Sequence, residues 1–215
     1  MVMVITVHYF DNAHAVLIDR GGGLIYDTIL DVTWMQDANY INTTGYDDAL
    51  YGYDTGGRIS WDDAVNWADN LVYFDAERNV TWDNWRLPHV LPINGSSYNY
   101  TRSVVGQTDD GYNISAPGTI YAGSTGSELA YMFYNNMGNL SFYDLNGNPN
   151  QPGWGNPSPG IFVNLVETNF WTGTEYAPDL NKAWLFDFQS GGQYSDGKDM
   201  LETVIEIIQT LVACA

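Results

Sequence analysis

The stretch Ala183-Trp-Leu-Phe-Asp-Phe188 carries the clearest strand pattern of this 215-residue chain. Trp184, Phe186 and Phe188 alternate with a leucine and an aspartate, which places three aromatic rings on one face of a strand. Shorter runs of strand-forming residues occur at 16–18, 24–26, 32–35, 162–165 and 170–172. Because 45% of the residues are hydrophobic and 15% are aromatic, we expect these strands to enclose a core.

Two segments carry helix signals. Ser60 can cap a helix over 61–72, which has apolar residues on one face. Thr125 and Glu128 form a capping box for a second helix, and Gly138 is a suitable stop. With so few helices beside the short strands, the sequence predicts a single α+β domain over residues 16–199.

Two long loops separate these elements. Residues 89–123 and 139–160 are rich in Asn, Gly, Ser, Pro and Tyr and show neither a helical nor a strand period. Loops of this length are uncommon inside a compact domain and are usually functional or tied down. Their tyrosines and tryptophans predict ordered loops that pack.

The charge balance excludes several partners. Seven Lys and Arg residues stand against 26 Asp and Glu, a formal net charge of −19. Nucleic acid is excluded, because binding phosphates needs clustered cations. Sulfated glycans and anionic membrane surfaces are disfavoured, whereas cations, neutral glycans and basic protein surfaces remain open. Cys214 is the only cysteine, so an intrachain disulfide is excluded as well.

The two ends of the chain carry different signals. Residues 1–15 resemble a truncated signal segment, with an apolar run before Ala13-His-Ala15, although the alternative is an ordinary first strand because a basic region is missing. The tail, residues 200–215, has apolar residues spaced by 3.6, which predicts an amphipathic helix. We expect this helix to pack on the domain or to mediate oligomerisation. No stretch has the roughly 18 consecutive apolar residues of a membrane span.

Catalytic groups are sparse in the sequence. Two of the three histidines fall within residues 1–15, so His89 and one terminal cysteine cannot form a zinc or copper site alone. Acid pairs such as Asp47-Asp48, Asp62-Asp63 and Asp109-Asp110 could serve a glycosidase, but adjacent carboxylates are usually solvated. We therefore expect no enzymatic activity and no catalytic residue.

Calcium is the cofactor that the acidic loops suit best. Hard cations take Asp carboxylates, Asn amide oxygens and backbone carbonyls. The candidate ligands are Asp144, Asn146 and Asn148 in one loop and Asp196 and Asp199 in another. Neither loop has EF-hand spacing, and the alternative is that each satisfies its own backbone through Asx-turns.

Several motifs occur in the order found in one bacterial family. They are Leu17–Asp27, Thr33–Asn39, Ser60-Trp61, Trp85-Arg-Leu-Pro88, Ser127-Glu-Leu129, Phe170-Trp-Thr-Gly-Thr174 and Ala183-Trp184. Over roughly residues 17–199 the chain resembles domain-of-unknown-function family 1566, also described as the C-terminal domain of a collagen-like adhesin (Lcl). The subgroup it most resembles consists of exported proteins, at the cell surface, outside the cell or in the periplasm.

The resemblance implies a C-type-lectin-like fold related to the formylglycine-generating enzymes. In that fold two helices flank a small twisted antiparallel sheet, and long ordered loops carry the binding surface. The residues expected to be structural are Trp85, Arg86, Leu87, Pro88, Glu128, Trp171 and Trp184. Arg86 would pair with a carboxylate, for which Glu128 is the candidate, with a plain helix cap as the alternative role of Glu128.

The sequence departs from this family in three respects. It lacks the cysteine pair of the generating enzymes, so that activity does not carry over. It also lacks the Glu-Pro-Asn and Gln-Pro-Asp triplets of calcium-dependent lectins, since Gln151-Pro is followed by glycine. The family usually closes with a strand, whereas residues 200–215 predict a helix.

The combined expectation is an exported, non-enzymatic binding or adhesion domain for a glycan or protein ligand, stabilised by calcium. The expected ligand contacts are the loop aromatics Trp154, Tyr143, Tyr112 and Tyr121, because exposed rings stack on sugar faces. The alternative is a structural subunit of a surface layer or an extracellular filament, with the loops and the tail making subunit contacts.

Overall fold

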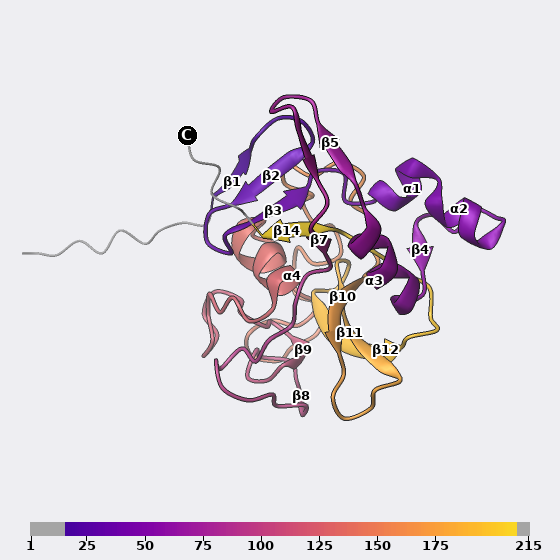
Figure 1. The fold of residues 1–215 in the computed structure, drawn as a ribbon. Helices are drawn as coiled ribbons and strands as arrows, with labels where there is room; N and C mark the ends of the chain where they lie inside the picture. The colour runs from indigo at the N-terminus through magenta and orange to yellow at the C-terminus, as the bar shows by residue number, and fades with distance from the viewer. Residues whose placement is uncertain (1–15, 210–215) are drawn as a thin grey trace, which may run out of the picture.

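The computed structural model describes residues 16–209. The expectation of a signal segment therefore lies outside the described residues, as does the end of the tail. The fold is mixed α+β, with most of the regular structure in strands (Figure 1). No helix within residues 16–209 is long and apolar enough to cross a membrane.

Two sheets form the body of the molecule. The smaller, wholly antiparallel sheet has the order β1 (Leu17–Asp19), β2 (Leu24–Asp27), β3 (Val32–Met35), β14 (Ile207–Gln209) and β7 (Trp85–Arg86). The larger sheet has the order β4 (Arg58–Ile59), β13 (Glu202–Thr203), β10 (Asn169–Glu175), β11 (Lys182–Asp187), β12 (Gly192–Gly197), β9 (Asp110–Tyr112) and β8 (Arg102–Ser103). Its β10–β13 and β8–β9 pairs are parallel. The structure therefore has more than the one small antiparallel sheet that we expected.

The remaining elements are short. A ribbon joins β5 (Tyr73–Asp75) to β6 (Val80–Trp82), and the helices are α1 (Tyr40–Thr44), α2 (Tyr46–Tyr51), α3 (Trp61–Asn70) and α4 (Glu128–Tyr131), which continues as the π-helix η1 (Met132–Asn136). Ser60 caps α3 as predicted, since its Oγ accepts from the Asp63 N–H at 3.3 Å. The cap of α4 is Ser127 and not Thr125, because the Ala130 N–H bonds to the Ser127 Oγ at 3.2 Å.

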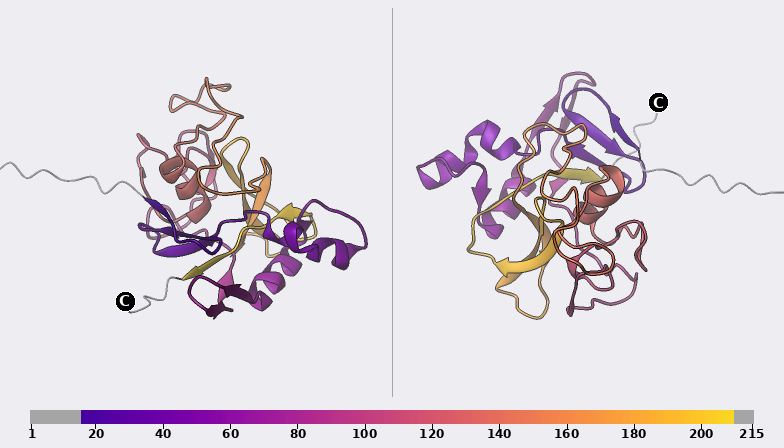
Figure 2. Two further views of the ribbon diagram at one scale, coloured as in Figure 1. Left: turned by 90° about the horizontal axis from the view of Figure 1, so that it is seen from above. Right: turned by 180° about the vertical axis from the view of Figure 1, so that it is seen from behind.

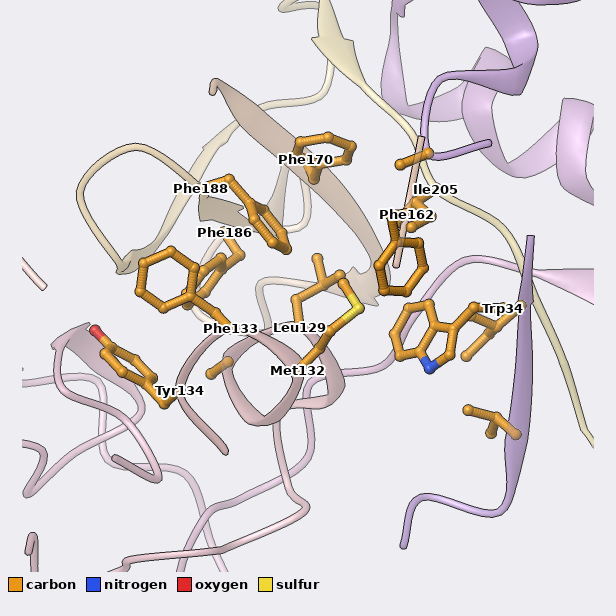
Figure 3. Close-up of a cluster of buried hydrophobic side chains, with 14 of the residues drawn as sticks. Trp34, Leu129, Met132, Phe133, Tyr134, Phe162, Phe170, Phe186, Phe188 and Ile205 are labelled. Carbon is orange, nitrogen blue, oxygen red and sulfur yellow. The ribbon is translucent and has the colours of Figure 1, made fainter. Parts of the chain in front are cut away.

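Two core clusters lie on opposite faces of β11. The first core cluster, shown in Figure 3, includes Trp34, Leu129, Met132, Phe133, Tyr134, Phe162, Phe170, Phe186, Phe188 and Ile205. The second core cluster includes Ile59, Trp61, Trp67, Trp85, Leu87, Trp171, Ala183, Leu185, Val204 and Ile208. The alternation predicted for residues 183–188 is confirmed, because Phe186 and Phe188 join the first cluster and Ala183 and Leu185 join the second.

Two of the three tryptophans that we expected to be structural, Trp171 and Trp184, are fully buried. The indole nitrogen of Trp171 donates to the Ile59 carbonyl at 3.1 Å. The ring of Trp184 stacks on Tyr100, with centroids 6.1 Å apart, and meets Tyr176 edge to face at 4.9 Å. Tyr100, which belongs to the 89–123 loop, thus packs against the larger sheet, as the composition of that loop predicted.

The helical prediction for the tail was wrong. Residues 202–203 form β13 between β4 and β10, and residues 207–209 form β14 between β3 and β7. Figure 2 shows β14, in yellow, next to the indigo strands of the smaller sheet. All side chains from 202 to 208 are buried, so the segment has no polar face of the kind that an amphipathic helix needs. A short apolar run does not distinguish a buried strand from a helix by its period. The side chains of 202–208 fill the core of their own chain, and oligomerisation through the tail stays a prediction.

Glu206 is a fully buried acid between the two tail strands. Its Oε1 accepts from the indole nitrogen of Trp67 at 2.5 Å, and its Oε2 has no hydrogen-bond partner in the described part of the chain. Burial raises the pKa of Glu206 to about 7, against an ordinary 4.5. The folded chain therefore keeps this carboxyl protonated over a range in which the unfolded chain ionises it.

Replacing the acid by its amide, Glu206→Gln, is expected to remove one pH dependence of stability. Between pH 4.5 and about 7 the unfolded state of the wild type binds fewer protons than the folded state. The wild-type free energy of unfolding therefore falls by about 3 kcal/mol as the pH rises through this range, with no penalty below it. The variant keeps the acceptor for Trp67 and cannot ionise. Urea unfolding of both proteins at either end of the range measures the difference.

The exposed Glu167→Gln variant serves as the control. If Glu206→Gln and Glu167→Gln show the same pH dependence as the wild type, the buried carboxyl does not titrate as described.

Candidate functional site

The motif Trp85-Arg-Leu-Pro88 places an ion pair at the base of the candidate site. The guanidinium of Arg86 donates from Nη1 to Oε2 and from Nη2 to Oε1 of Glu128, both at 2.8 Å. Oε2 of Glu128 also accepts from the His89 N–H at 2.5 Å. Trp85, Leu87 and Pro88 are buried beside the pair. The pairing of Arg86 with Glu128 expected from the motif is thus present, and it is bidentate.

Next to this ion pair, backbone hydrogen bonds join two segments that are far apart in the sequence. The Glu128 N–H donates to the His89 carbonyl at 3.2 Å, and Val90 forms an antiparallel bridge with Ser127. The Leu91 N–H then donates to the Gly126 carbonyl at 2.6 Å. A Cβ on Gly126 would lie 2.8 Å from the Leu91 carbonyl oxygen, so only glycine allows this close approach.

Beyond this contact the two segments of the chain separate and line a groove. Residues 91–96 form one wall and residues 121–126 the other, around a volume of about 640 Å³. The Ser124 hydroxyl donates to the Ile93 carbonyl at 2.8 Å and so ties the walls together across the floor. We call this feature the 91–126 groove.

The 91–126 groove is lined without an Asp, Glu, Lys, Arg or His side chain. Its polar side chains are the hydroxyls of Ser96, Tyr121, Ser124 and Thr125 and the amide of Asn94. Within residues 16–209 the Tyr121 and Thr125 hydroxyls and the Asn94 Nδ2 make no hydrogen bond, whereas the Asn94 Oδ1 accepts from the Ser96 hydroxyl and from the backbone of Ser96 and Ser97. Leu91 is 55% exposed at the rim. The groove thus offers one aromatic ring, apolar surface and neutral hydrogen-bonding groups.

Three of the four expected ligand contacts lie elsewhere, in one string of rings. Tyr112 meets Tyr143 at 4.9 Å, Tyr143 meets Phe142 at 4.9 Å, and Phe142 meets Trp154 edge to face at 4.6 Å. Each ring is half-buried and already packs against another ring. Tyr121 alone lines the groove. The sequence gave no local signal for Leu91 or Asn94 and pointed to Thr125 only as a helix cap, because the groove arises from a contact between residues far apart in the chain.

The expected calcium ligands satisfy one another. Oδ1 of Asp144 accepts from the N–H groups of Asn146 and Asn148 at 2.9 and 2.8 Å, and its Oδ2 accepts from the Asn148 amide at 2.9 Å. These bonds, first that from the Asn148 side chain, lower the pKa of Asp144. The Asx-turn alternative therefore describes this loop. Oδ1 of Asp196 accepts from the Gly197 N–H at 2.8 Å.

Asp199, the last expected calcium ligand, lines a different cavity. Asp62 and Asp63 also line that cavity, which has a volume of about 750 Å³. Asp199, Asp196 and Asp144 belong to no group of three carboxylate, His or Cys side chains that is compact enough for one ion in the described ranges. Calcium binding by these residues stays a prediction.

Comparisons of the chain with protein-family models, with curated proteins and with solved structures found no match.

Removing the acceptor in Glu128→Ala is expected to lower the free energy of unfolding by about 2–4 kcal/mol, because the Arg86 guanidinium and the His89 N–H then lose their partner in a largely buried place. Glu128→Gln keeps one acceptor oxygen, so its free energy of unfolding should lie between those of Glu128→Ala and the wild type. Urea unfolding measures both, and the exposed Glu167→Ala is the control. Equal stabilities of Glu128→Ala and Glu167→Ala would show that the pair contributes nothing.

Proposed function

We propose that this chain is an exported, non-enzymatic binding domain of C-type-lectin-like fold that takes an uncharged, carbohydrate-type ligand in the 91–126 groove. One observation carries the proposal. The chain has 26 acidic residues, yet a groove built from two loops is lined by none of them and by no cation. Such a lining suits a neutral polyhydroxylated ligand better than a charged one.

The chemistry of the lining supports this choice of ligand. Sugars present apolar C–H faces and hydroxyl edges, which an aromatic ring and neutral donors and acceptors complement. Tyr121 supplies the ring, and Asn94 and Thr125 supply groups that make no hydrogen bond to the rest of the described chain. The volume of about 640 Å³ lies within the usual range for ligand sites.

The base of the groove supports a rigid site. The Arg86–Glu128 pair and the Val90–Ser127 bridge fix where the two walls begin, before any ligand arrives. A site that is formed in advance loses less conformational entropy on binding.

Tyr121→Ala is expected to weaken binding of neutral glycans at least roughly tenfold, because the stacking surface in the groove is lost. Tyr121→Phe should keep most of the affinity. The measurement is a screen of neutral and charged glycans followed by calorimetry on the best ligand. Trp154→Ala is the matched aromatic control and should bind like the wild type, because Trp154 packs on Phe142 outside the groove.

Normal binding by Tyr121→Ala together with loss of binding in Trp154→Ala would contradict this proposal. It would place the ligand site at the rings of Tyr112, Tyr143, Phe142 and Trp154 instead. Concentration-dependent self-association without binding of any neutral glycan would favour the structural subunit of a surface layer or filament instead.

A further inference from the structure

Three carboxylates come together from helix α2 and the loop that follows it. Asp47 and Asp48 lie in the first turn of α2, and Asp54 follows the helix after the left-handed Gly52, at φ 77°. One oxygen from each of the three lies within 4.8 Å of the others. Helices α1 and α2 project to one side of the body, away from the 91–126 groove walls (Figure 1). None of the three residues lines that groove.

The loop holds two of these carboxylates by one oxygen each. Oδ2 of Asp47 accepts from the Thr55 hydroxyl at 2.6 Å and from the Gly57 N–H at 2.9 Å. Oδ1 of Asp54 accepts from the Gly56 N–H at 2.7 Å. These bonds fix the carboxylates and leave the other oxygen of each for a further partner.

Asp47 provides a second and independent observation. Its side chain is fully buried, and its Oδ1 has no hydrogen-bond partner in residues 16–209. A buried ionised carboxylate is normally paired with a cation or bound to a metal.

None of the ion pairs within residues 16–209 involves Asp47, Asp48 or Asp54. These ion pairs are Arg78–Asp75, Arg86–Glu128, Arg102–Asp110 and Lys198–Glu175. Arg58, at the end of the loop, donates its Nε to the Thr55 carbonyl at 3.0 Å. Asn39, whose amide donates to the Gly56 carbonyl, has a buried Oδ1 that also lacks a donor in the described part.

We propose that Asp47, Asp48 and Asp54 bind one hard divalent cation, calcium in preference to magnesium, through the oxygen of Asp47 that the fold leaves buried and unbonded. The donor set is all oxygen, which hard cations select. Asp48 and Asp54 are exposed, so water completes the coordination on the open side. Calcium accepts such irregular, partly hydrated sites, whereas magnesium demands near-octahedral geometry.

The bound ion would fasten the loop that leads into the larger sheet. Gly57 precedes β4, and β4 pairs with β13 through Arg58 and Thr203. Since the site is remote from the 91–126 groove, its role is in stability, and it stands or falls separately from ligand binding.

Thermal unfolding in calcium against chelator tests the site. In wild type, calcium at about 10 mM should raise the midpoint by about 2–4 °C, and magnesium should raise it less. The double variant Asp48→Asn/Asp54→Asn should lose this shift and should fold without calcium at least as well as wild type, because it removes like-charge repulsion at exposed positions. Calorimetry with calcium chloride should give one ion per wild-type chain.

Asp144→Asn is the matched control, because that loop was the first calcium candidate and satisfies itself. It should respond to calcium like the wild type. The proposal is overturned if the wild type shows no calcium shift, or if the double variant keeps the shift while Asp144→Asn loses it.

Discussion

The burial of residues 202–208 is the constraint on which the other features of this structure depend. This short segment supplies β13 to the larger sheet and β14 to the smaller one, so each sheet is incomplete without it. Its side chains divide between the cores, with Val204 and Ile208 in the second core cluster and Ile205 and Ile207 in the first. Glu206 lies between them, and its protonated state keeps a charge out of the core at the cost of a pH-dependent stability.

Both candidate sites are attached to this segment through its neighbouring strands. β14 pairs with β7 at Ile207 and Arg86, and Arg86 then holds Glu128 at the base of the 91–126 groove. β13 pairs with β4 at Thr203 and Arg58, directly after the loop of the carboxylate cluster. The strand pairs thus connect this segment to the base of the 91–126 groove and to the loop of the carboxylate cluster.

Local patterns predicted those features that depend on neighbouring residues. The alternation at 183–188, the Ser60 cap and the Arg86–Glu128 pair were all accessible, since each rests on spacing or on the scarcity of cations. The helix predicted for the tail was wrong because a run buried on all sides carries the same apolar signal in a helix and in a strand. The 91–126 groove and the meeting of Asp47 with Asp54 depend on long-range or turn geometry, for which adjacent carboxylates in the sequence give no sign.

The distribution of charge separates the two proposed roles. The lining of the 91–126 groove has no carboxylate that could hold an ion beside a bound ligand. The cluster of three carboxylates, in which Asp47 has an unbonded buried oxygen, belongs to α2 and the loop after it instead. An ion there acts on the free energy of the folded state and reaches the ligand only through the shared core, whereas ligand affinity rests on neutral contacts. Stability and binding are thus assigned to different residues of the same acidic chain.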